Sequence, residues 1–178
     1  MVLAPKILGN SHTNHGFLTL SPYSFVDQLL QTIKITHVVS ILGQSDDLPW
    51  PNVGARKVLR LQYDDTTYSS AGFIAPTKDN VSELISFAKK WGGKSGLLVH
   101  CRAGTSRSPA AAMICLAAIG RTDLIVSLLS RRAYYKPHAK SLRIYDAISG
   151  STERLSTFLP ENTALNRVDD LSPATVVF

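Results

Sequence analysis

Cysteine is scarce in this sequence: Cys101 and Cys115 are the only two among 178 residues. The segment between them is predicted to become a helix near Arg107. That helix separates the two Cα atoms by more than the roughly 4.4–6.8 Å that a disulfide permits. We therefore expect two free thiols, which are typical of a reducing compartment, and a cytoplasmic location.

Long apolar runs are also lacking. The longest one, residues 110–119, is about half the length of a helix that crosses a bilayer, so we interpret it as a buried helix. The N-terminal stretch MVLAPKILGNSHTN contains one lysine and no continuous apolar core of signal-peptide length. No membrane span and no export signal are expected.

Clusters of charge are missing as well. The net charge is +6, from 19 Lys and Arg and 13 Asp and Glu, but the basic residues are scattered and do not alternate with aromatic ones. This balance favours anionic partners such as phosphorylated proteins, and it does not predict nucleic-acid binding. His12 and His15 are weak metal candidates that are better explained as exposed histidines, so no metal site is predicted.

Apolar segments alternate with turn signals along most of the chain. Strands are predicted at residues 35–42, 57–63 and 96–100. Helices are predicted from Ser21 and Pro22 to residue 33, and at residues 81–91, 108–120, 122–131 and 141–148. This order predicts an α/β domain with three layers, α/β/α, around a central, mainly parallel sheet of about four to five strands. We expect one domain over residues 1–160 and a loosely ordered tail over residues 161–178.

The spacing Cys-x5-Arg occurs twice, at Cys101 and Arg107 and at Cys115 and Arg121. Cys101 follows a predicted strand, and the short residues after it lead into a helix. Such a loop turns unpaired backbone N–H groups and a helix N-terminus toward one point, which makes an anion site. Cys115 lies inside an apolar helix whose N–H groups are already bonded, so we interpret it as core.

The first of these copies lies in a longer motif. The nine residues His100-Cys101-Arg102-Ala103-Gly104-Thr105-Ser106-Arg107-Ser108 resemble the active-site signature of cysteine-dependent protein tyrosine phosphatases. The Ala-Gly-x-Ser-Arg-Ser part is similar to the dual-specificity branch and to compact bacterial members. The element order of residues 35–120 resembles the family too, whereas the detailed match is confined to the loop.

The resemblance implies the family's fold, a two-step reaction and a role for each loop residue. Cys101 would attack phosphorus and form a cysteinyl-phosphate, and Ser108 would help the thiolate to leave. Arg107 would bind the phosphate, His100 would organise the loop, and no metal or cofactor would be needed. The same loop would hold phosphate, sulfate or vanadate. The amides that would hold the phosphate oxygens belong to Arg102, Ala103, Gly104, Thr105, Ser106 and Arg107.

The family also implies a general acid on a loop that precedes the nucleophile's strand. Residues 50–52, Trp-Pro-Asn, look like the Trp-Pro-Asp loop of classical members, but asparagine cannot donate this proton. Asp65 is the preferred candidate and Asp64 the alternative, because both follow a predicted strand at about the family's distance from Cys101. Lys136, His138 and Lys140 border the cleft or form a solvated loop.

The leading hypothesis is a phosphatase that acts on phosphotyrosine, with phosphoserine and phosphothreonine as further substrates. A phosphoinositide or another small phosphomonoester is the alternative within the same chemistry. A sulfurtransferase and a catalytically inactive phosphate-binding module are the competing classes. The sequence leaves the physiological substrate and the oligomeric state open.

Overall fold

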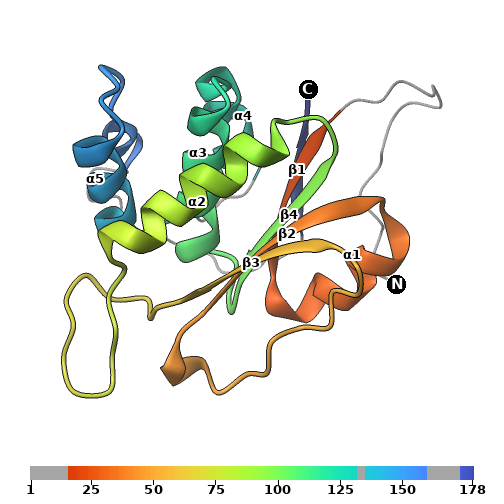
Figure 1. Cartoon of the computed structure of the whole chain (residues 1–178), viewed down its shortest axis with the longest axis horizontal. Helices are drawn as coiled ribbons and strands as arrows, with labels where there is room; N and C mark the ends of the chain where they lie inside the picture. Colours follow the sequence, from red (N-terminus) through yellow and green to blue (C-terminus); the bar gives the residue numbers. More distant parts are fainter. Residues whose placement is uncertain (1–15, 132–134, 160–172) are drawn as a thin grey trace.

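A computed structural model describes residues 16–131, 135–159 and 173–178 of the chain (Figure 1). The candidate metal residues His12 and His15 lie outside the described residues. Five strands form one sheet in the order β3-β2-β4-β1-β5. Four of them are parallel and β5 runs antiparallel at the edge, so the predicted α/β fold with a mainly parallel sheet is confirmed. The strands are β1 (Phe17–Pro22), β2 (Ile35–Leu42), β3 (Lys57–Gln62), β4 (Gly96–Cys101) and β5 (Ala174–Val177).

Helices cover both faces of the sheet. The helix α1 (Val26–Thr32) packs on one face, where Leu98 of β4 joins its cluster, and the other α-helices pack on the opposite face, where Leu97 and Val99 lie (Figure 1). This alternation follows from the twofold side-chain period of a strand, and it explains why all six residues of β4 are buried. The other α-helices are α2 (Lys78–Trp91), α3 (Arg107–Ala118), α4 (Ile125–Leu129) and α5 (Ala139–Ile148).

Two predicted helix starts were wrong. Ser21 and Pro22 end the strand β1, whose pairing with β4 buries Leu18 and Leu20, and the helix α1 begins only after a short 3-10 turn at Tyr23–Phe25. Thr122 does not cap a helix, because the chain first makes a 3-10 turn at Thr122–Leu124 and then the short α4. Burial in the sheet outweighs the local helix signals at residues 21 and 22.

The predicted tail needs a correction where the structure describes it. Residues 174–177 form β5, which pairs with β1 and places Ala174 and Val176 in the core. These residues are therefore part of the sheet and not a loose end. Residues 160–172 lie outside the described part of the chain.

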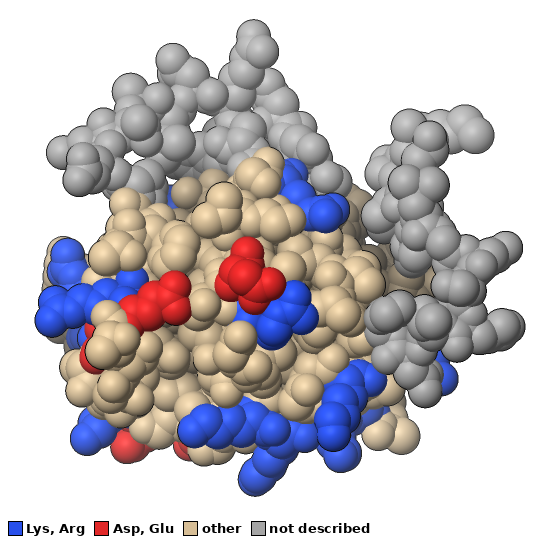
Figure 2. Space-filling model, turned by 90° about the horizontal axis from the view of Figure 1, so that it is seen from above, with Lys and Arg blue, Asp and Glu red and all other residues tan. Residues whose placement is uncertain are grey.

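The parallel strands bring several loops to one end of the molecule. The loops after β2, β3 and β4 lie together on the lower side of Figure 1, where α3 begins. Figure 2 shows the opposite end, with Lys and Arg side chains mainly around its border. None of the described helices is both long enough and apolar enough to cross a bilayer.

Candidate active site

The loop that resembles the phosphatase signature, residues 101–107 and called the Cys101 loop below, joins the end of β4 to the start of α3. The Gly104 N–H donates to Cys101 Sγ at 3.2 Å, and Ser108 Oγ lies 3.2 Å from the same sulfur. Cys101 is 2% exposed. An N–H group and a hydroxyl thus lie at hydrogen-bond distance from the thiol.

Gly104 is needed for the shape of this loop. Its φ is +72°, and a Cβ atom placed there would lie 2.6 Å from the Pro22 nitrogen. The end of β1 therefore packs directly against the loop. The Tyr23 N–H, just after β1, also donates to the Arg102 carbonyl at 3.0 Å. Only glycine combines the left-handed conformation with such a close approach.

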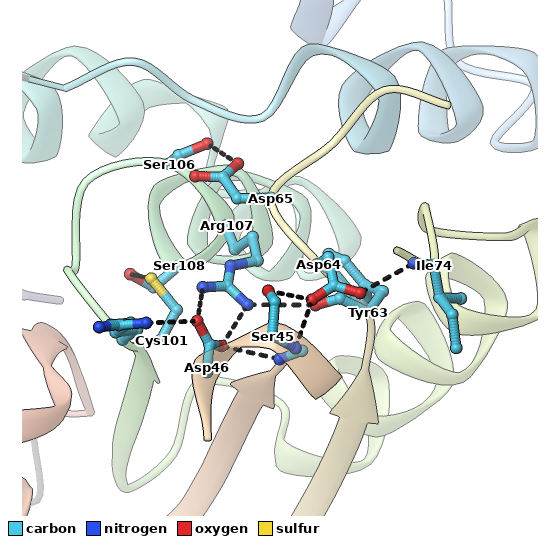
Figure 3. Close-up of polar contacts among 12 residues, drawn as sticks. Ser45, Asp46, Tyr63, Asp64, Asp65, Ile74, Cys101, Ser106, Arg107 and Ser108 are labelled. Atoms are coloured by element: carbon cyan, nitrogen blue, oxygen red, sulfur yellow. Dashed lines mark hydrogen bonds and ion pairs between the residues drawn. The ribbon is translucent and has the colours of Figure 1, made fainter. Parts of the chain in front are cut away.

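Arg107 is held by an aspartate that the sequence analysis did not identify. Its Nη1 and Nη2 atoms donate to the two carboxylate oxygens of Asp46 at 2.7 and 3.0 Å, and Nη1 also donates to the Tyr63 carbonyl at 3.1 Å (Figure 3). Both side chains of the ion pair are about 5% exposed or less. The Arg107 Nε–H group is buried and has no hydrogen-bond partner among the described residues, so it can donate to an anion.

The contacts of Asp46 favour its ionised state. Burial by itself would raise the pKa of this carboxyl, but hydrogen bonds from Arg107 and from the Gly43 N–H hold it below its ordinary value. Asp46 ends a short 3-10 turn, Gln44–Asp46, that directly follows β2. The guanidinium of Arg107, the last residue of the Cys101 loop, therefore keeps a fixed orientation.

The two candidate acids have different environments. Asp64 is 1% exposed and accepts hydrogen bonds from the Ser45 N–H at 3.0 Å, from the Ser45 hydroxyl and from the Ile74 N–H at 2.8 Å. Burial would raise its pKa, but these bonds lower it, so Asp64 stays an anion that closes the base of its loop. Asp65 is 47% exposed and accepts a hydrogen bond from Ser106 Oγ at 2.6 Å (Figure 3).

The structure also places the remaining residues that the sequence analysis considered. His100 is fully buried with Nε2 2.7 Å from Ser40 Oγ, and burial lowers its pKa to about 4, so it is neutral at neutral pH. The N–H groups of Lys136 and His138 donate to the carbonyls of Thr105 and Ser106 at 3.0 and 3.1 Å, so this segment borders the Cys101 loop.

The second Cys-x5-Arg copy has no such surroundings. Cys115 is fully buried in α3, and burial raises the pKa of its thiol far above the ordinary value. Arg121 instead pairs with Asp123 at 3.0 Å on the surface.

The Trp-Pro-Asn segment, residues 50–52, forms a loop turn. Asn52 accepts a hydrogen bond from the Gly54 N–H at 3.1 Å, which is the turn that its sequence indicates.

Comparisons with known proteins concern the fold. No family model matches the chain, and no curated protein matches it. The human tyrosine phosphatase-like serine/threonine/tyrosine-interacting protein is 24% identical, with a TM-score of 0.57 over 75% of this chain and 93% of that one. DUSP15 is 24% identical, with a TM-score of 0.54 over 75% and 83% of the two chains. The chain has a tyrosine-phosphatase fold.

The tyrosine-phosphatase fold extends to more distant structures. OH1 from the Orf virus, a tyrosine phosphatase with triple substrate specificity, is 14% identical, with a TM-score of 0.51 over 76% of this chain and 83% of that one. At such identities the likeness concerns the backbone alone.

Asp46 and Ser40 are the polar site residues that sequence reasoning missed. Asp46 follows β2 in the way that Asp65 follows β3, and parallel strands end at one edge of a sheet. That rule is the only signal that could have found Asp46. Among the described residues, no group of three or more His, Cys, Asp or Glu side chains could hold a metal ion.

Proposed function

We propose that this chain is a phosphatase that hydrolyses phosphomonoesters, foremost phosphotyrosine in proteins, through a cysteinyl-phosphate. The observation that carries the proposal is the convergence of an N–H group and a hydroxyl on Cys101 Sγ, each at 3.2 Å, beside a buried guanidinium with a free donor. Guanidinium, loop amides and the N-terminus of α3 supply positive potential where a phosphate would bind, so the reaction needs no metal.

In the first step the Cys101 thiolate attacks phosphorus, the S–P bond forms and the bond to the leaving oxygen breaks. Arg107 and the loop amides hold the non-bridging oxygens as their charge redistributes. Asp65 gives its proton to the leaving oxygen. Asp65 suits this task because its carboxyl is half-exposed and reaches the Cys101 loop, whereas Asp64 is buried among donors that keep it ionised.

In the second step water attacks phosphorus and the S–P bond breaks. Asp65, now ionised, accepts a proton from this water. The Ser108 hydroxyl, 3.2 Å from Cys101 Sγ, donates to the thiolate as it departs. Enzyme and inorganic phosphate are restored, and vanadate inhibits by occupying the same loop.

The alternatives rest on specific features. Arg102 is the one additional basic side chain of the Cys101 loop, which gives little support to a polyanionic phosphoinositide. An inactive phosphate-binding module is the second candidate, because one similar structure is described as phosphatase-like and as an interacting protein. The acid beside the loop argues against a sulfurtransferase.

The two free thiols, Cys101 and Cys115, support a reducing compartment, and we propose the cytoplasm.

Turnover of an aryl phosphate against pH tests the proposal. We expect Cys101→Ser to abolish turnover, and Asp65→Asn to lower it by roughly 10²–10⁴-fold with loss of the descending limb at high pH. Asp64→Asn keeps that limb and loses mainly stability, because it removes acceptors of buried N–H groups. Full activity in Cys101→Ser would refute the mechanism, and loss of the limb in Asp64→Asn alone would exchange the two aspartates.

A further inference from the structure

Contacts outside the proposed chemistry tie Asp65 and the residue after it to the Cys101 loop. Ser106, within that loop, donates from Oγ to Asp65 Oδ1 at 2.6 Å. His138, which precedes α5, lies 3.0 Å from the Thr66 carbonyl through Nε2. The backbone N–H of His138 donates to the Ser106 carbonyl at 3.1 Å. The two residues whose side chains contact Asp65 and Thr66 are therefore hydrogen-bonded to each other.

We propose that Ser106 and His138 are positioning residues that hold Asp65 beside the Cys101 loop before the substrate binds. The inference rests on the proposed function, in which Asp65 is the general acid. It adds that the acid-bearing loop, residues 65–73, is fixed in advance at its first two residues. The benefit is orientation: a proton donor that is already in place loses little freedom when the reaction occurs.

The geometry of the His138 ring suits a holding role. A carbonyl oxygen can only accept, so Nε2 must carry the proton that is shared with Thr66. Nδ1 then caps α5 by accepting from the Ser141 N–H at 3.4 Å, and it also lies 3.0 Å from Ser141 Oγ. Neutral imidazole offers one donor and one acceptor, and both are used here.

The surroundings keep His138 in that neutral form. The side chain is 4% exposed, and its ring lies 6.1 Å from the Tyr63 ring. Burial lowers its pKa, and the nearby cations Arg107 and Lys140 act in the same direction, whereas the Asp65 carboxylate, 3.8 Å from Nε2, and the bond to Thr66 oppose them. Nδ1 therefore keeps its lone pair for the Ser141 N–H at neutral pH, while Nε2–H donates to Thr66.

Asp64 fixes the backbone at the base of the loop, whereas the Asp65 side chain contacts Ser106 and lies 3.8 Å from His138 Nε2. The Asp65 side chain is half-exposed, and Tyr68 and Phe73 farther along the loop are 69% and 47% exposed, so the loop lacks an apolar anchor there. Loss of either positioning residue should therefore impair proton donation and leave phosphate binding intact. That combination separates a positioning role from a general structural one.

The test compares two esters, phenyl phosphate, whose leaving group needs a proton, and p-nitrophenyl phosphate, whose leaving group does not. We expect Ser106→Ala and His138→Asn to lower kcat/KM for phenyl phosphate roughly tenfold more than for p-nitrophenyl phosphate, with little change in KM. Asparagine still caps α5 but is too short to reach Thr66. Ser106→Thr keeps the hydroxyl and should keep the wild-type ratio.

His37→Ala is the matched control. His37 is a 9% exposed histidine at the other end of the sheet, 2.8 Å from Thr36 Oγ1, so its loss reports destabilisation without touching Asp65. It should leave the ratio between the two esters unchanged. A positioning variant that behaves like this control would remove its residue from the proposal.

Combination with Asp65→Asn decides whether the effect passes through Asp65. We expect Ser106→Ala and His138→Asn to cost less than about twofold in that background, because the group they position is gone. Fully additive losses of activity in the double variants, or an equal loss on both esters in the wild-type background, would overturn the inference. The proposed function would still be supported in that case by turnover of the wild type and by the defect of Asp65→Asn. A wild type that hydrolyses neither ester would refute both.

Discussion

At the scale of single residues, the orientation of Arg107 depends on one carboxylate. Asp46 binds both Nη atoms, and the pair is buried, so neither partner can turn to water if the other is lost. A buried charge without its partner is costly, and a guanidinium without a fixed orientation binds phosphate less well. Asp46 thus acts on the proposed chemistry through Arg107.

Asp46→Asn should show this dependence. We expect the free energy of unfolding to fall by about 3 kcal/mol, because a buried ion pair loses one of its charges. The inhibition constant for inorganic phosphate should rise by roughly tenfold, because Arg107 is no longer held in place. Urea denaturation and inhibition assays measure the two effects.

Asp47→Asn is the control for Asp46→Asn. Asp47 is exposed and has a φ of +49°, a conformation that asparagine tolerates, so this variant removes a neighbouring charge at little cost. Equal effects of the two substitutions would mean that net charge, and not the contact with Arg107, determines phosphate binding.

The residues with a local signal could be predicted from the sequence. Cys101 and Arg107 stand in a motif between a strand and a helix, and the pair Asp64 and Asp65 follows a predicted strand. The choice between these two aspartates needs the contacts of Ser45 and Ser106, which lie far away in sequence. Asp46 was missed because its partner Arg107 comes close only when β2 pairs with β4.

At the scale of elements, the Cys101 loop depends on its support by β1. Gly104 lies so close to Pro22 that a side chain does not fit, and its positive φ adds a second reason for glycine. The strand β1 was not predicted, because Ser21 and Pro22 resemble a helix start and the pairing with β4 has no local signature. The contact between β1 and the Cys101 loop therefore could not be predicted from the sequence.

Gly104→Ala should destabilise the protein by more than the free-energy cost of placing alanine in a left-handed conformation. The conformation costs about 1–2 kcal/mol, and the contact with Pro22 adds to it, so we expect a larger loss of stability and weaker phosphate inhibition. Gly120→Ala is the matched control, with a φ of +74° and no heavy atom within 4 Å of the added Cβ. Equal losses of stability and unchanged phosphate inhibition would show that the contact with Pro22 is unimportant.

At the scale of the whole molecule, the parallel sheet gathers the proposed site from distant parts of the chain. Asp46 follows β2, Asp65 follows β3, and Cys101 ends β4. These strands are neighbours in the sheet, so the three residues lie at the carboxyl ends of adjacent strands (Figure 1). The alternation of strands and helices sufficed to predict this architecture. The strand order could not be predicted, since it depends on pairings such as β2 with β4 that join segments distant in sequence. The edge strand β5 could not be predicted either, since it pairs with β1 at the other end of the described chain.

The most direct measurement asks where the phosphoryl group goes. Wild type and Ser108→Ala are mixed with an aryl phosphate and quenched within one turnover, and their peptides are analysed by mass spectrometry. We predict a phosphoryl group on Cys101 in both proteins, more of it in Ser108→Ala because the thiolate departs more slowly, and none on Cys115. Turnover without phosphorylated Cys101, or with the label on another residue, would contradict the proposed mechanism.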